Sequence, residues 1–209
     1  MVVLRDGAAA GPHGMEVYLI KRSRTVDFMA GAYVFPGGRL DKADSSLQAC
    51  AVRETFEEAS LQLDPATLVP WVRWITPEIS PKRFDARFFL ARAPAGQEPK
   101  VDGHEATEGL WIAPREALRR WEAREMQLAP ATAKSIELLS AFATVDAALA
   151  AAAARPPPVA MPLVWNDKES GRAYISLPGD PRHPLPDVLG GKIRRFELTE
   201  GRYRKVSAT

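Results

Sequence analysis

The segment from residue 33 to residue 61 places the tightest constraint on the fold. It is typical of a strand that ends at a Pro-Gly-Gly break, followed by a helix from about residue 46 to residue 61. Gly37 and Gly38 permit backbone angles that are closed to other residues, so the chain can turn sharply from the strand into the helix. A stripe of apolar residues on the helix is expected to pack against a sheet, formed by Ala49, Val52, Phe56 and Ala59.

Three carboxylates share the other side of this helix. With about 100° of rotation per residue, Glu54, Glu57 and Glu58 fall on one face, near the apolar residues Cys50 and Leu61. Carboxylates crowded in such a setting repel one another and take up protons unless a cation compensates. Mg²⁺ prefers oxygen ligands, of which proteins supply one or two carboxylates. The face therefore indicates either a metal site or a solvated acidic surface, and the helix alone leaves both open.

The rest of the first 154 residues predicts a mixture of strands and helices. Two antiparallel hairpins are expected, one from residues 2–5 and 15–22, the other from residues 71–76 and 83–91, and a short strand at residues 108–112. A helix opens at Pro114, where a missing N–H costs nothing. One or two Ala-rich helices follow over residues 130–153.

Proline divides the chain. Eight of the 18 prolines fall after residue 155, beginning with the triple proline at 156–158. Residues 155–209 hold ten basic and six acidic side chains, a local charge of +4, so residues 1–154 carry −2 of the total of +2. Runs at residues 173–177, 194–198 and 202–206 suggest a small antiparallel β unit. We expect a domain over residues 1–154 and a Pro-rich, basic β extension over residues 155–209, packed on the domain or on a dimer partner.

Composition excludes several classes of protein. Near-neutral charge argues against nucleic acid as a partner, since displacing counterions from phosphates needs a concentrated positive excess. The longest apolar run, at residues 147–154, is far shorter than the roughly 20 residues that a spanning helix needs, so no membrane partner is expected. With a single cysteine, Cys50, and no leader-like segment, the expected location is the cytoplasm.

The segment PGGRLDKADSSLQACAVRETFEEASL resembles the signature of the Nudix hydrolases, in which a glycine and a glutamate precede Arg-Glu-x-x-Glu-Glu-x-Gly. Three departures are present. One extra residue separates Gly38 from Arg53, Asp44 best matches the first glutamate, and Ser60 takes the place of the last glycine. Asp44 is expected either to anchor the loop or to cap the helix.

The resemblance implies an α+β fold, an α/β/α sandwich with a mixed β-sheet between helices. It implies a hydrolase of phosphoanhydride bonds in nucleoside diphosphates linked to another group. It also implies Mg²⁺ or Mn²⁺ as the cofactor, with Glu54, Glu57, Glu58 and the carbonyl of Gly38 as metal ligands. The metal would neutralise the pyrophosphate and activate a water. Arg53, four residues before Glu57, is in reach to orient that carboxylate.

Further catalytic and substrate-binding residues follow from the resemblance. Family members often take a general base from a later loop, here residues 101–112, and Glu105 is our first choice and Glu108 the second. The alternative is that Glu105 and Glu108 are both loop charges without a catalytic role. Four residues are expected to bind substrate phosphates: Arg22, Arg24, Gly37 and Arg83. The alternative is that Arg22, Arg24 and Arg83 are solvated surface residues that bind no substrate.

Flanking segments indicate a branch of the family. Residues 28–44 and 74–90 are similar to segments of proteins related to the peroxisomal coenzyme A diphosphatase. Coenzyme A or acyl-coenzyme A is therefore the candidate substrate, with nucleotide sugars and dinucleotides as alternatives. A different class of function is also possible on the same fold, namely a sensor that binds a nucleotide ligand without hydrolysing it. A homodimer is expected from family habit.

Overall fold

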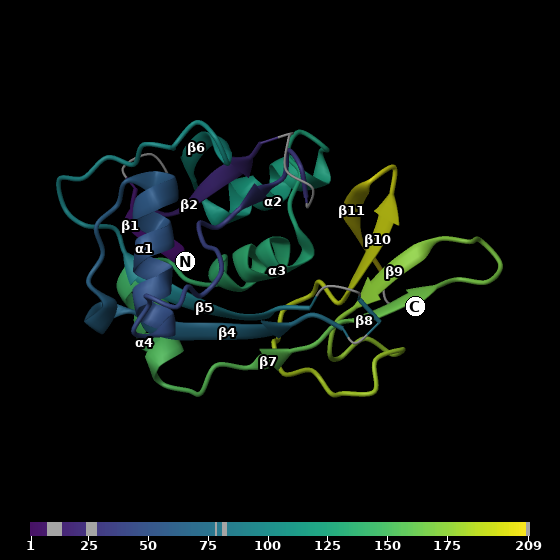
Figure 1. Cartoon of the computed structure of the whole chain (residues 1–209). Coiled ribbons are helices and arrows are strands. Elements are labelled where there is room, and N and C mark those ends of the chain that lie inside the picture. Colours follow the sequence, from purple (N-terminus) through teal and green to yellow (C-terminus); the bar gives the residue numbers. More distant parts are fainter. Residues whose placement is uncertain (8–13, 24–28, 78, 81–82, 208–209) are drawn as a thin grey trace.

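The computed structural model describes residues 1–7, 14–23, 29–77, 79–80 and 83–207. Arg24, one of the predicted phosphate-binding residues, lies outside these ranges. Figure 1 shows two β-sheets of unequal size, with helices on both faces of the larger one. Within the described residues, no helix is both long enough and apolar enough to cross a lipid bilayer.

The larger sheet is mixed. Its strands are β1 (Val2–Asp6), β2 (Met15–Arg22), β3 (Tyr33–Val34), β4 (Val69–Ile75), β5 (Asp85–Arg92), β6 (Ala106–Ile112) and β7 (Val159–Ala160). The order is β3-β2-β1-β5-β4-β7, and β6 also pairs with β2. The pairs β1–β5 and β4–β7 are parallel, whereas the two predicted hairpins, β1–β2 and β4–β5, are confirmed as antiparallel. The strand before the glycines spans only two residues.

Side chains that alternate along the strands build two cores. Val2 and Leu4 face a core shared with α2 (Pro114–Glu122), α3 (Pro130–Leu139) and α4 (Val145–Ala153). Met1 and Val3 face the opposite core, which is closed by α1 (Leu47–Ala59). A period of two along a strand places successive residues on opposite faces. The predicted α/β/α sandwich with a mixed sheet is therefore confirmed, with a short 3₁₀ turn, η1 (Pro65–Thr67), after α1.

The buried side of α1 differs from the predicted apolar stripe. Phe56, in the middle of that stripe, is 48% exposed. The helix instead buries Cys50, Thr55, Glu58 and Ala59. The predicted stripe is confirmed for Ala59, and Val52 packs against the same core, but the prediction was wrong for Phe56. The helix is turned so that Glu58 points inward, where its carboxylate accepts a hydrogen bond from a backbone N–H. A periodicity analysis counts a glutamate as polar and cannot anticipate such a partner.

The two ends of α1 explain two departures from the family signature. Ser46 caps the N-terminus, since its side chain accepts a hydrogen bond from Ala49 N, so Asp44 does not cap this helix. At the other end, Ser60 takes the left-handed conformation with φ of 57°. A glycine adopts this conformation without strain, whereas a residue with a Cβ does not. Ser60 gains a bond in exchange, because its hydroxyl donates to Lys100 O at 3.1 Å.

The C-terminal extension forms a second sheet and also joins the first. Its strands are β8 (Leu163–Asn166), β9 (Ala173–Ser176), β10 (Arg195–Thr199) and β11 (Arg202–Val206), in the order β11-β10-β9-β8. The sequence patterns indicated the last three but neither β8 nor β7. Strand β7 adds to the edge of the larger sheet beside β4. The small sheet lies at the end of the molecule away from α1 (Figure 1).

A buried lysine fastens the extension to the helical layer. Lys134, on α3, is 1% exposed, and its Nζ donates to Glu137 Oε2 at 2.7 Å, Gly190 O at 2.6 Å and Ile193 O at 2.8 Å. The other oxygen of Glu137 accepts the backbone N–H of Ile193 at 2.8 Å. A Cβ on Gly191 would lie 2.6 Å from Glu137 Oε2, so only a glycine permits this approach. The ion pair therefore satisfies backbone groups of the extension as well as itself.

We expect Lys134→Met to lower the free energy of unfolding by about 3–5 kcal/mol, because it leaves the Glu137 carboxylate, whose side chain is 12% exposed, without its charged partner. Lys192→Met is the matched control, since the Lys192 side chain is exposed on the same loop. Urea unfolding of both variants measures the difference. Equal stability of the two variants would show that the contacts of Lys134 with Glu137 and the extension do not stabilise the fold.

We expect Ser60→Gly to raise the free energy of unfolding by up to about 1 kcal/mol, because relief of the left-handed strain exceeds the loss of one exposed hydrogen bond. Ser60→Ala keeps the strain and loses the same bond, so it should destabilise the protein. Thermal unfolding of the pair separates the two effects. A glycine variant less stable than the alanine variant would show that strain is not the dominant cost.

Candidate active site

The glycine pair after β3 wraps around two carboxylates of α1. Gly37 N donates to Glu58 Oε2 at 2.7 Å. A Cβ on Gly38 would lie 2.2 Å from Glu54 Oε2, a separation that side chains essentially never show. Gly37 has a φ of 151°, which disfavours other residues. Gly38 is therefore required by its missing side chain, whereas Gly37 is favoured by its backbone angle, and the N–H that it donates to Glu58 would be present in any residue except proline.

Arg53 is the centre of an ion-pair network on the outer side of α1. Its Nε and Nη2 hold the two oxygens of Asp44 at 3.0 and 2.9 Å. Its Nη1 lies 2.9 Å from Glu54 Oε1 and 3.0 Å from Glu57 Oε2. The forked guanidinium suits such bidentate pairing, and it holds the pKa of Asp44 at about 2. Asp44 therefore anchors the loop through Arg53, the first of its two predicted roles.

Glu57 stands apart from the other two glutamates. Its side chain is 55% exposed and turned toward Arg53. Within the described ranges, no three acidic, histidine or cysteine side chains lie close enough together to form a ready metal site. The three predicted ligands share one helix, but the positive charge beside Glu54 and Glu57 is supplied by Arg53. A cation that bound all three glutamates would have to draw the carboxylates of Glu54 and Glu57 away from the Arg53 guanidinium.

Glu58 lies in an environment that favours a cation. It is only 6% exposed. Burial, together with the nearby carboxylates of Glu54 and Glu105, raises its pKa to about 7, although the Gly37 N–H and the N-terminal ammonium of Met1 oppose the shift. A carboxylate in such surroundings is relieved either by a proton or by a metal ion. The carboxylate oxygens of Glu54 and Glu58, beside flexible glycine backbone, thus fit a hard divalent cation in chemistry.

The structure distinguishes the surroundings of the two predicted general bases. Glu105 is close enough to Glu58 for their charges to interact, and its loop is fixed by hydrogen bonds from Glu105 N to Asp102 and from Ser23 N to Glu105 O. Glu108 lies on β6 opposite Lys21, with 3.3 Å between its Oε2 and Lys21 Nζ. The carboxylate of Glu105 therefore lies near those of α1, whereas the carboxylate of Glu108 forms an ion pair at the surface.

A hollow of about 550 Å³ opens beside the glycine pair. It is lined by Gly37, Gly38, Arg22 and Arg83, so these predicted residues come together in space. Two further arginines line it, Arg39 and Arg87, which the predicted site did not include. Arg39 directly follows the glycines, a signal that the sequence did carry. The hollow thus has backbone suited to a pyrophosphate at one end and guanidinium groups around it.

Apolar side chains complete the rim of this hollow. Leu40, Leu47 and Phe84 line it and are each about half exposed, at 56%, 40% and 41%. The residues lining the hollow lie between Met1 and Thr132. The extension therefore packs elsewhere.

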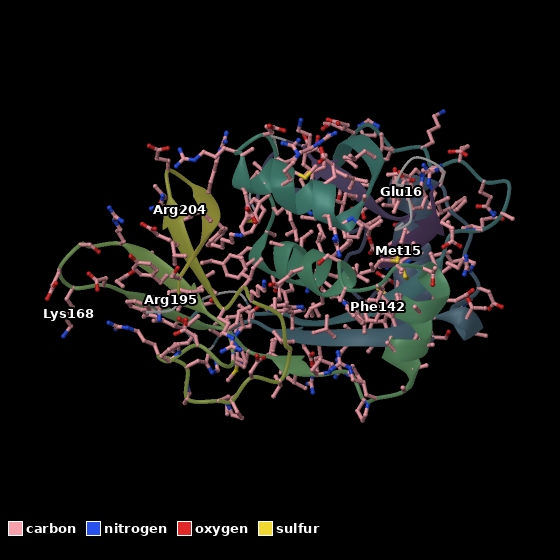
Figure 2. The ribbon with its side chains drawn as sticks, turned by 180° about the vertical axis from the view of Figure 1, so that it is seen from behind. Met15, Glu16, Phe142, Lys168, Arg195 and Arg204 are labelled. Carbon is pink, nitrogen blue, oxygen red and sulfur yellow. The ribbon has the colours of Figure 1, made fainter. Side chains whose placement is uncertain are left out.

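A second cavity of about 640 Å³ lies on the other side of the sheet. Its lining includes Met15, Glu16 and Phe142, which Figure 2 shows from behind, far from the extension residues Lys168 and Arg204. It contains none of the predicted site residues. We therefore place the candidate site in the hollow beside the glycine pair.

Comparison with protein families agrees with the geometry. The family model described as NUDIX domain matches residues 1–134, which include the glycine pair, α1 and the loop that carries Glu105. The chain belongs to the Nudix hydrolase family. The protein is therefore a hydrolase, and its family generally depends on divalent metals. Family membership does not identify the substrate or the metal.

Individual relatives are more distant. "Putative nudix hydrolase 7" of Caenorhabditis elegans is 30% identical over 165 residues, which cover 59% of this chain and 55% of the relative. "Acyl-coenzyme A diphosphatase NUDT19" of Xenopus laevis is 23% identical over 232 residues, covering 63% of this chain and 61% of the relative. The chain thus spans less than two thirds of the length of these curated relatives.

A solved structure shares the fold. A crystal structure of a NUDIX hydrolase from Alicyclobacillus acidocaldarius superposes with a TM-score of 0.61 at 24% identity. The match covers 74% of this chain and 95% of that one. At this identity the likeness shows the fold alone.

We expect Gly38→Ala to lower the hydrolysis rate by about 100-fold, because a Cβ displaces the Glu54 carboxylate by an ångström or more. Gly96→Ala is the control, since an added Cβ there meets nothing within 4 Å although φ is +74°. Both variants are compared with the wild-type protein in steady-state assays and in thermal unfolding. The same activity in both variants would argue against a tight fit between Gly38 and Glu54.

Proposed function

We propose that this Nudix hydrolase is a divalent-metal-dependent diphosphatase, which cleaves the phosphoanhydride bond of a nucleoside diphosphate linked to another group. The observation that carries the proposal is the packing of Glu54 and Glu58 against the glycine pair, at the edge of a hollow lined by arginines. Carboxylates behind the glycine pair and arginines around the hollow suit a ligand that is itself a polyanion bound with a cation.

The proposed metal ligands are Glu54, Glu57, Glu58 and the carbonyl of Gly38. Mg²⁺ or Mn²⁺ bound there would neutralise negative charge on the pyrophosphate and lower the pKa of an attacking water. The donor set fits, since all four groups offer hard oxygen atoms. Glu57 contributes only if its carboxylate turns from Arg53, which now holds it at 3.0 Å.

Each of the remaining residues has a proposed part in catalysis. Glu105 accepts the proton of the attacking water, because its carboxylate lies in the same group as that of Glu58. Arg53 positions Glu54 and Glu57, and Asp44 in turn fixes Arg53. The N–H of Gly37 fixes Glu58. These contacts hold the carboxylates in place before substrate arrives.

The candidate substrate is coenzyme A or an acyl-coenzyme A. The relative from Xenopus laevis carries the name of an acyl-coenzyme A diphosphatase, and the hollow combines arginines with the apolar rim of Leu40, Leu47 and Phe84. Arg22 and Arg83 are proposed to bind phosphate oxygens, together with the N–H groups of the glycine loop. Arg24 is proposed for the same role from the sequence alone. A homodimer and a cytoplasmic location stay predictions.

We expect Glu58→Gln and Glu105→Gln each to lower kcat by about 10²- to 10⁴-fold, since one removes a charge that holds the metal and the other removes the base. Glu108→Gln is the matched control, because Glu108 pairs with Lys21 away from the carboxylate group. A loss of kcat in Glu108→Gln as large as that in Glu105→Gln would reverse the assignment of the base.

The substrate assignment is tested by a screen of coenzyme A, nucleotide sugars, dinucleotides and nucleoside triphosphates with Mg²⁺ or Mn²⁺. Metal-dependent release of a 3′-phosphorylated nucleoside monophosphate from coenzyme A is the expected result. Preferred cleavage of a nucleotide sugar or a dinucleotide would replace the substrate and keep the mechanism. Binding of these ligands without cleavage would favour a sensor, and cleavage undiminished in Glu58→Gln would overturn the mechanism.

A further inference from the structure

We infer that the β4–β5 hairpin carries a second anion-binding subsite of the hollow, in which Arg83 and Arg87 bind a phosphate monoester of the substrate. This phosphate is separate from the pyrophosphate that the glycine loop and α1 receive. The inference rests on the proposed function for the identity of the substrate. It narrows the substrate class to nucleotides that carry a monoester in addition to the diphosphate.

The first observation is an imbalance of charge on the hairpin. Among the described residues, Asp85 is the one carboxylate that pairs with the hairpin arginines Arg73 and Arg87. Arg73 takes it in a close bidentate pair, with Nε–Oδ1 of 2.8 Å and Nη2–Oδ2 of 2.6 Å. Arg87 reaches the same oxygens only at 3.1 and 3.4 Å. One carboxylate thus pairs with two arginines, with the closer contacts to Arg73, so the three residues keep a net positive charge that a ligand can meet.

Arg83 adds a second positive charge at the same place. Its Nε donates to the carbonyl of Thr76 at 3.1 Å, which orients the guanidinium without neutralising it. In the part of the chain that the structure describes, no carboxylate lies within ion-pair distance of Arg83. Arg73, Arg83 and Arg87 therefore face one acid. An oriented guanidinium with donors to spare is suited to the oxygens of a phosphate monoester.

The second observation is the direction in which these groups point. Arg87 and Phe89 are two residues apart on β5, so they lie on the same face of the sheet. Phe89 packs in the core beneath α1, and the hollow is lined by Arg83, Arg87 and the glycine pair together. Arg73 does not line the hollow. The hairpin arginines thus face the same hollow as the glycine loop, from a different wall.

A nucleotide supplies the remaining contacts. Phe84 lies between Arg83 and Asp85 in the chain, lines the hollow and is 41% exposed. An exposed ring beside a cationic pair offers an apolar surface to a nucleoside and charge-assisted hydrogen bonds to its phosphate. A molecule that carried only a pyrophosphate would leave Arg87 to share Asp85 with Arg73 and would bring no anion to Arg83.

The test measures binding and needs no turnover. Adenosine 3′,5′-bisphosphate and adenosine 5′-monophosphate are titrated into the metal-free protein by calorimetry, and inorganic phosphate is added as a competitor. We expect the bisphosphate to bind at least about tenfold more tightly, as charge-assisted hydrogen bonds to one phosphate would give. Arg83→Ala and Arg87→Ala should each abolish most of that preference. Arg155→Ala is the control, because Arg155 is exposed and lies in the extension.

Arg73→Ala provides a test of the positioning role. Without Arg73, Asp85 is free to neutralise Arg87, so the preference for the bisphosphate should fall although Arg73 does not touch the hollow. A merely structural role for Arg73 would lower affinity for both nucleotides equally. In each variant the difference between the two nucleotides is the readout, so a general loss of stability does not imitate the effect.

Three outcomes would overturn the subsite: equal affinity of the wild-type protein for the two nucleotides, a preference that survives in both hairpin variants, or binding of neither nucleotide. The proposed function fails separately. Hydrolysis of coenzyme A without bisphosphate preference would leave the diphosphatase and remove the subsite. Arginine-dependent preference in a protein that cleaves no diphosphate would leave the subsite and remove the activity.

Discussion

The hydrogen bond from Gly37 N to the buried carboxylate of Glu58 is the contact on which the rest of the site depends. It sets the rotation of α1, because the face that carries Glu58 must turn toward the glycine loop. That rotation exposes Phe56 and places Glu54 against Gly38. The pKa of Glu58 stays raised although this N–H and the N-terminal ammonium of Met1 both favour the charged form, so the site favours a proton or a further cation.

Patterns local in sequence predicted much of this arrangement. The spacing of Arg53 and Glu57 on one helix gave their ion pair, and alternating apolar residues gave the hairpins. What failed depends on contacts between distant segments. The orientation of α1 follows from a partner 21 residues before Glu58. The extension is fixed by bonds from Lys134 to carbonyls 56 and 59 residues away. Strand β7 is two residues long and pairs Val159 with Arg73, a residue far away in the sequence, so it has no periodicity to detect.

The departures from the family signature have separate physical consequences. Asp44 has a shorter side chain than glutamate, yet it keeps a bidentate pair with Arg53. The extra residue between the glycines and Arg53 leaves the contacts of Gly37 and Gly38 with the helix in place. Ser60 accepts a strained conformation that a glycine would take freely. Of the three departures, Ser60 is thus the one that places a residue with a side chain in the left-handed conformation.

The two walls of the hollow impose a condition on what binds there. The carboxylates of Glu54 and Glu58 pack against the glycine pair at the edge of the hollow without lining it, and they repel a phosphate. The hairpin wall, with Arg83, Arg87 and Asp85, keeps a net positive charge that attracts one. A polyanion held only by the arginines would therefore sit away from α1, and it could approach the carboxylates only with a cation between them. Binding of metal and substrate should consequently favour each other, since each compensates the charge that the other leaves exposed.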